Sequence, residues 1–290
     1  MSKAMILFFV VAIIMTSMAC GLTIDLPIDR IVTGPAQTEE ILIPAPETEG
    51  IDLTLNFGAG ELKIKHAQGI SDVPFIKGTA VYNVPDFKPE IEVESNKVSL
   101  TTGQLELRGF PSLNDDVINR WDLELGNTPM NLEINSGAYK GDLNLGGVPL
   151  KSLDITDGAA DVRLRFSSPN PLEMDRLRYQ TGASNVQLSG LANANFSSLV
   201  FRSGAGNYRL DFSGLLNRDA VANIESGFSQ LELVVPNGTT AKVITGGGLM
   251  NVDYSGGWEK EGNNYLLGSE KPVLTINVDM GAGNLVLLTK

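Results

Sequence analysis

Apolar and polar residues alternate along most of this chain, and a Gly-Ala pair interrupts the alternation at regular intervals. An apolar residue and two mostly polar residues precede each pair, and further alternating apolar positions follow it. Successive copies from Gly137 to Gly247 lie 20 to 24 residues apart, and the last step is 34 residues. A fixed period of this length is typical of one structural unit stacked on copies of itself. The pattern occurs at Gly58, Gly137, Gly158, Gly182, Gly204 and Gly281, with weaker copies at Gly227 and Gly247.

Each copy predicts two short strands joined at a glycine corner. Around Gly158, the apolar residues Leu153 and Ile155 alternate with polar ones before the corner, and Val162 and Leu164 do so after it. This period of two is the pattern of a half-buried strand. Glycine suits the corner because it permits either a left-handed backbone or a close backbone approach.

The predicted fold is therefore all-β: a single-stack β-solenoid of about 22-residue coils with Gly-Ala corners, over residues 51–290. The coils are expected to be less regular over 51–130 and regular over 131–290. An antiparallel β-sandwich or meander is the alternative, because glycine turns also recur in those folds. The regular spacing of the apolar positions favours the solenoid.

The N-terminus has the organisation of a secretory signal, with a basic start, an apolar run from Ala4 to Ile14 and small residues after it. The run is too short for a membrane-spanning helix. Cys20 is the single cysteine and stands where a bacterial lipoprotein has its lipid-modified cysteine. We predict a signal peptide over 1–19 and lipid attachment at Cys20. An ordinary cleaved signal and an uncleaved anchor are the alternatives.

Residues 20–50 are rich in proline, threonine and glutamate. This composition predicts an extended linker between the lipidated cysteine and the β domain. A first strand is expected at its end, over Ile41–Ile43.

Composition excludes several classes of function. The chain has 34 acidic and 22 basic residues, a net charge of −12, so it lacks the basic surface that binds nucleic acid. His66 is the single histidine, so one chain cannot form a His/Cys metal cluster, and a Ser-His-Asp triad would need that residue. We expect His66 in an exposed loop, and we expect no catalytic residue, metal or cofactor.

The outward-facing arginines raise the possibility that this protein is an enzyme, because β-helix polysaccharide lyases use a basic residue beside carboxylates that hold a cation. Six arginines lie at outward or corner positions, spread over the coils without clustered acidic partners, which favours an ordinary solvated face. They are Arg163, Arg165, Arg176, Arg178, Arg202 and Arg209.

The 34-residue step contains two aromatic residues, Trp258 and Tyr265. They are interpreted either as ligand contacts that stack on sugar rings or as a cap on the open end of the apolar column. The cap is favoured, because a stacked array must protect its ends.

The order of several short motifs resembles the bacterial toast-rack β-repeat proteins, a group with adhesin-type domains and the extracytoplasmic domain of cell-wall-active-antibiotic response (LiaF-like) proteins. The resemblance covers residues 51–290 and implies a β-helix-like stack without catalytic residues, with a place in adhesion or envelope-stress sensing. The motifs are Phe57–Ile64, Lys77–Asn83, Trp121–Leu125, Leu132–Ala138, Gly257–Trp258, Leu274–Val278 and Gly281–Leu285.

These observations predict a non-enzymatic extracytoplasmic lipoprotein, tethered to a membrane through Cys20, that acts as an adhesion, binding or scaffold module. One alternative is an envelope-stress sensor that binds cationic antimicrobials. A second is a carbohydrate-active β-helix enzyme. The expected partners are the membrane, through the lipid, and an envelope glycan, a cationic peptide or a protein.

Overall fold

The computed structural model of the protein describes residues 33–46, 50–69, 73–103 and 117–290. The predicted signal peptide and Cys20 lie outside these ranges. No helix within them is long and apolar enough to cross a membrane.

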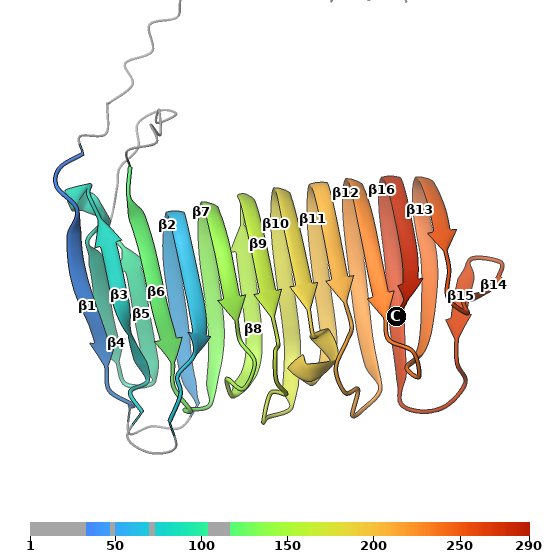
Figure 1. Ribbon diagram of the computed structural model, residues 1–290, viewed down its shortest axis with the longest axis horizontal. Coiled ribbons are helices and arrows are strands. Elements are labelled where there is room, and N and C mark those ends of the chain that lie inside the picture. Colours follow the sequence, from blue (N-terminus) through green and yellow to red (C-terminus); the bar gives the residue numbers. More distant parts are fainter. Residues whose placement is uncertain (1–32, 47–49, 70–72, 104–116) are drawn as a thin grey trace, which may run out of the picture. The chain divides into compact units, whose positions relative to one another are not determined.

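The described residues form a 16-stranded sheet and two short 3₁₀ turns, η1 (Pro85–Phe87) and η2 (Leu191–Ala194), which confirms the all-β prediction (Figure 1). The strands are β1 (Gln37–Ile43), β2 (Ile51–His66), β3 (Ile76–Tyr82), β4 (Pro89–Glu94), β5 (Lys97–Thr102), β6 (Asn119–Leu125), β7 (Met130–Asn144), β8 (Leu150–Asp157), β9 (Ala159–Arg165), β10 (Met174–Ser189), β11 (Phe196–Asp211), β12 (Ala220–Val235), β13 (Thr240–Tyr254), β14 (Glu259–Glu261), β15 (Asn264–Leu267) and β16 (Val273–Thr289).

The long strands bend at their glycine corners, so their two halves enclose a core between two layers. We call these the first layer and the second layer, after the halves that form them. The buried rings of Phe201 and Tyr208, from the two halves of β11, meet edge-on with centroids 5.3 Å apart. Phe57 of the first layer likewise meets Trp121 of the second at 5.1 Å.

Neighbouring long strands pair in parallel, residue beside equivalent residue. Leu132 lies beside Leu153, Leu153 beside Leu177, Leu177 beside Leu199, and Leu199 beside Ala222, in steps of 21 to 24 residues. All five side chains are buried. Burying each leucine contributes about 1.5–3 kcal/mol. The parallel pairing excludes the antiparallel sandwich or meander for these strands.

The corner glycines of the regular coils are required by close approach rather than by a left-handed backbone, whereas Gly58 has a φ of 64° and open space around it. Neither Gly182 nor Gly204 has a positive φ. A Cβ on Gly182 would lie 2.4 Å from the carbonyl oxygen of Gly158, and one on Gly204 would lie 2.7 Å from that of Gly182. The corner of each coil therefore packs against the backbone of the corner before it.

The order of strands in space departs from the chain order near the C-terminus. β16 lies between β12 and β13, although β13 precedes it in sequence. Its corner, Gly281, faces Gly227 on one side and Gly248 on the other. The corner of β13 is thus Gly248 rather than the Gly247 that the repeat pattern indicates.

Near the N-terminus, β2 pairs with β5 through its first half and with β6 through its second. The strand expected at Ile41–Ile43 is the end of β1, which pairs antiparallel with β3. The first layer therefore runs from β4 and β5 through the long strands to β15 and β14. The second runs from β1, β3 and β6 to β13.

Candidate functional site

Two rows of outward-facing side chains cross six strands of the first layer near its β4 end. Their chain neighbours Leu53, Val98 and Leu132 are buried, and side chains alternate between the faces of a strand, so these residues face outward. In register, one row is Glu94, Lys97, Asp52, Asn131, Ser152 and Arg176, and the other is Glu92, Ser99, Thr54, Glu133, Asp154 and Arg178.

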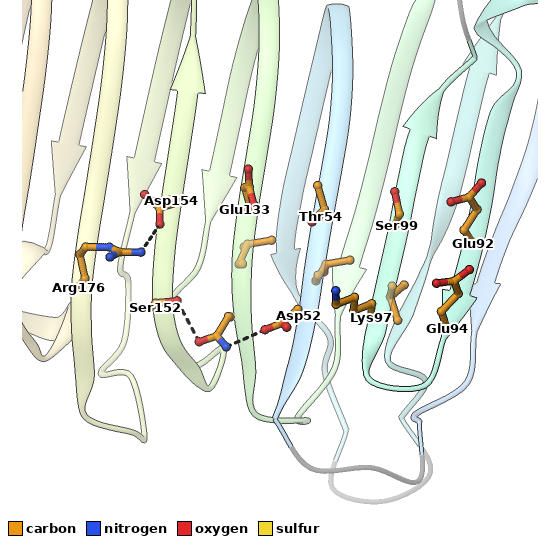
Figure 2. A pocket seen from close by; sticks show the side chains of 14 residues that line it. Asp52, Thr54, Glu92, Glu94, Lys97, Ser99, Glu133, Ser152, Asp154 and Arg176 are labelled. Carbon is orange, nitrogen blue, oxygen red and sulfur yellow. Dashed lines mark hydrogen bonds and ion pairs between the residues drawn. The ribbon is translucent and has the colours of Figure 1, made fainter.

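These rows form a groove of about 570 Å³ (Figure 2). Short side chains such as Thr54, Ser99 and Ser152 make its floor, whereas the long side chains of β4 and of Arg176 stand at its ends. Six strands at a spacing of about 4.8 Å give the groove a length of about 24 Å. An extended ligand could lie along it, across the strands.

Negative charge dominates this groove, which we call the acidic groove. Arg176 Nη2 lies 2.8 Å from Asp154 Oδ2, and Arg178 pairs with the same carboxylate. Asp154 is thereby neutralised, which leaves Lys97 as the remaining cation of the lining. Five carboxylates line the groove against two cations; the carboxylates are those of Asp52, Glu92, Glu94, Glu133 and Asp154.

Hydrogen bonds between neighbouring strands hold the floor in place. Asn131 Nδ2 donates to Asp52 Oδ1 at 2.8 Å, and Ser152 Oγ donates to Asn131 Oδ1 at 2.9 Å. Glu92 and Glu94, on the outermost strand, are exposed. The groove therefore combines a fixed polar floor with adjustable carboxylates at its rim, an arrangement that accepts hydrogen bonds from cationic groups.

The two aromatic residues singled out in the sequence lie far from this groove, at the other end of the stack. Trp258 is 6% exposed and Tyr265 is 2% exposed, and both belong to the core. The ring of Tyr265 meets that of Tyr254 edge-on at 5.2 Å, and Lys260 Nζ lies 5.5 Å from its centroid. Because both rings are buried, neither offers a free face to a sugar, and the end-cap interpretation remains a prediction.

Within the described residues, five of the six outward arginines, all except Arg163, are paired with carboxylates of neighbouring strands. Arg165 Nη2 lies 2.7 Å from Asp142 Oδ1, and Arg202 Nε lies 3.0 Å from Glu225 Oε2. Arg209 pairs with Glu232 in the same way. Such exposed pairs are worth about 0–1 kcal/mol each, so they tie neighbouring rows together without forming a reactive centre.

The single histidine was expected in an exposed loop, but it is the last residue of strand β2 and is half-buried. His66 Nε2 lies 2.7 Å from Asn127 Oδ1. In the parts of the chain that the structure describes, no group of three or more His, Cys, Asp or Glu side chains is arranged to hold a metal ion.

A buried polar cluster centred on Asp157 was not predicted from the sequence. Asp157 accepts hydrogen bonds from Tyr179 Oη, at 2.7 Å, and from Thr181 Oγ1. Burial raises the pKa of Asp157 above its usual range, although these hydrogen bonds act in the opposite direction. Burial also raises the pKa of Tyr179. The available signal was a polar residue just before each corner, since Asp157, Thr181 and Ser203 lie in one register.

The acidic groove was also missed, because its members come from six strands and meet only once the register is known. Glu94 and Lys97 are close in sequence, but Asp52, Asn131 and Arg176 join them from distant parts of the chain. What the sequence does show is the excess of acidic residues.

A two-layered stack of bent parallel strands places the chain among the β-repeat proteins, and the comparisons with known proteins identify the family. The model of the N-terminal domain of toast_rack, DUF2154, matches residues 32–176. The chain belongs to this family. A search of the curated proteins finds no match.

Solved structures are similar to this chain over most of its length. A "putative cell adhesion protein" from Clostridium sporogenes is 21% identical, with a TM-score of 0.50 over 88% of this chain and 100% of that one. A "putative adhesin" from Bacteroides fragilis is 10% identical, with a TM-score of 0.40 over 88% of this chain and 97% of its own. A "putative lipid binding protein" from Parabacteroides distasonis is 12% identical, with a TM-score of 0.34 over 87% and 97%.

Proposed function

We propose that the protein is a non-enzymatic, membrane-tethered extracytoplasmic lipoprotein whose β domain is an adhesion or binding module, with the acidic groove as its contact surface. The observation that supports this most is the groove itself, which is long, polar and negatively charged. The name of the Clostridium sporogenes protein, a cell adhesion protein, agrees with such a role.

The fold supports a binding or scaffold role through its regularity. We interpret the stack as one β-solenoid-like array with a coil of about 22 residues, and the steps of 21 to 24 residues between β7 and β12 support this. Stacked rows give an extended surface on which a long ligand can make many weak contacts.

The tether is proposed from the sequence, through a signal peptide over 1–19, lipid on Cys20 and a linker. The linker was expected to continue to residue 50, but strand β1 already begins at Gln37. Cys20→Ala should release the protein from membranes, because the lipid is its proposed attachment. Fractionation of expressing cells measures this directly. A Cys20→Ala protein that stays in the membrane fraction would contradict the tether.

The chemistry of the groove favours a cationic ligand. Its carboxylates accept hydrogen bonds and attract positive charge, while the arginines of the outer face are engaged by carboxylates of adjacent rows. A basic segment of a partner protein or a cationic peptide meets this description.

An envelope-stress sensor for cationic antimicrobials is the second candidate, and the exposed carboxylates of Glu92 and Glu94 at the groove rim are the observation that favours it. Both candidates predict that the full chain in a neutral detergent binds oligolysine, and that binding weakens as salt rises, because salt screens exposed charges. Affinity that is the same at low and high salt would contradict both. A cationic antimicrobial that binds much more tightly than oligolysine of equal charge would favour the sensor.

A further inference from the structure

The two layers end in four edge strands, and three of these edges have features that block pairing with another strand. β1 has Glu39 and Glu40, β4 has Pro89 and three glutamates, and β14 is charged at each position. The fourth edge is the second half of β13, Gly246–Tyr254, where Asp253 is the one charged residue. Charges and proline are the usual protection of edge strands. We call Gly246–Tyr254 the open edge.

Alternate residues of the open edge have backbone N–H and C=O groups that point away from the sheet. In the described residues this segment pairs with β16 alone. Ser255 N–H donates to Leu287 O of β16 at 3.0 Å. Because the backbone groups of successive residues point to opposite sides of a strand, those of Met250, Val252 and Tyr254 point outward, where they could extend the ladder.

The second layer is also shorter than the first at this end of the stack. The first layer continues past β13 into β15 and β14, whereas the second stops at β13 (Figure 1). Leu285 and Leu287 of β16 are fully buried, but their neighbours Val252 and Tyr254 are partly exposed, Tyr254 at 45%. One further strand would cover these side chains and lie over β15.

We propose that the open edge receives an extended strand from a partner polypeptide, with apolar residues at alternate positions and neutral or basic residues between them. The apolar residues would cover Met250 and Val252, while the others would face the same side as Asp253, on a chain of net charge −12. Strand addition of this kind takes its affinity from main-chain hydrogen bonds and its specificity from alternate side chains.

A second copy of this chain fits the open edge poorly. If two open edges paired antiparallel, the β14–β15 hairpins of both copies would project into the same space beneath the junction. Two chains of net charge −12 would also repel each other. The proposal concerns a surface separate from the acidic groove and does not depend on it.

The test uses the full chain in a neutral detergent and a labelled peptide of alternating valine and lysine, matched in length to the open edge. Val252→Pro should weaken binding about tenfold, because it removes an outward N–H that a partner strand needs. Val252→Ala, which keeps that N–H but trims the apolar contact, is the comparison variant and should weaken binding less than Val252→Pro does. Asp253→Lys should also weaken binding.

Hydrogen exchange gives a second measurement that does not require any variant to fold. The peptide should slow exchange at the amides of Met250, Val252 and Tyr254, which face outward. The amides of Leu249 and Asn251, which face β16, should change little. A peptide with the same composition but clustered valines should protect neither set.

Three results would overturn the proposal. The first is binding that survives both Val252→Pro and Asp253→Lys. The second is binding that is lost instead in the Glu92→Gln/Glu94→Gln double variant, which would assign the peptide to the acidic groove. The third is a peptide-free dimer that Val252→Pro dissociates, which would make a second copy the occupant.

Discussion

At the scale of single residues, the repeat pattern does not predict which polar groups are buried. Asp157 is 6% exposed and sits inside the stack, held by hydroxyl groups of the next row. Asn170 is buried in a loop, where its side chain bonds to the backbone N–H and C=O of Leu150. Such groups are tolerated because they are hydrogen-bonded. Asp157 and Asn170 each link two neighbouring coils of the stack.

Asp157 predicts a specific pH dependence of stability. Its folded-state pKa is raised by burial, so the folded protein holds this proton more tightly than the unfolded chain does. The resulting contribution to the free energy of unfolding is complete below the ordinary aspartate pKa and is lost as pH rises through the raised value. Asp157→Asn should therefore gain stability relative to the wild type as pH rises through this window.

Denaturant unfolding of the two proteins at a series of pH values measures this difference. Asp161→Asn is the matched control for the loss of one aspartate, because Asp161 is exposed on the outer face. A curve for Asp157→Asn that runs parallel to the wild type would show that the buried carboxyl does not have the pKa that its surroundings imply.

At the scale of strands, the glycine corner determines how closely two rows can approach. The carbonyl oxygen of each corner occupies the space that a Cβ on the next corner would need. The approach varies along the stack, from 3.1 Å for a Cβ on Gly137 through 2.4 Å for one on Gly182 to 2.3 Å for one on Gly248. This gradation makes the packing of the corners testable.

Substituting alanine at the corners should destabilise the fold in the order of these distances. Gly182→Ala should cost about 1–3 kcal/mol, Gly204→Ala somewhat less, and Gly137→Ala least, because the backbone must shift further where the clash is closer. Gly34→Ala is the control, since its Cβ would lie 3.8 Å from the nearest atom at a negative φ. Equal losses at all three corners, measured by denaturant unfolding, would contradict this account.

The sequence was sufficient for the strands and corners because each depends on local features. Alternation marked the inward residues, such as Leu177 and Leu199, and glycine marked the corners. The insertion of β16 between β12 and β13 could not be predicted in this way, because several rows have nearly the same apolar pattern. Leu53 pairs with Leu132, which is distant in sequence, and the apolar pattern does not predict this pairing either. Which rows become neighbours depends on packing of the whole stack.

At the scale of the whole molecule, the acidic groove and the open edge lie at opposite ends of one array of strands (Figure 1). The groove faces outward from the first layer beside β4, and the open edge ends the second layer at β13. An array with two separate proposed contact surfaces suits a module that connects two partners. Its acidic residues favour basic partners at both surfaces.

The central claim is that the acidic groove binds cationic ligands through its own arrangement of charges and not through the net charge of the protein. The most direct test compares oligolysine binding to two double variants of the full chain that lose the same charge. Glu92→Gln/Glu94→Gln removes two carboxylates from the groove, and Glu259→Gln/Glu261→Gln removes two from β14 at the opposite end.

We predict that the groove variant binds oligolysine about tenfold more weakly than the wild type, a loss of about 1.4 kcal/mol. The β14 variant should bind within about twofold of the wild type. Equal weakening in both variants would show that binding follows overall charge alone, and would contradict the assignment of the groove as the functional site.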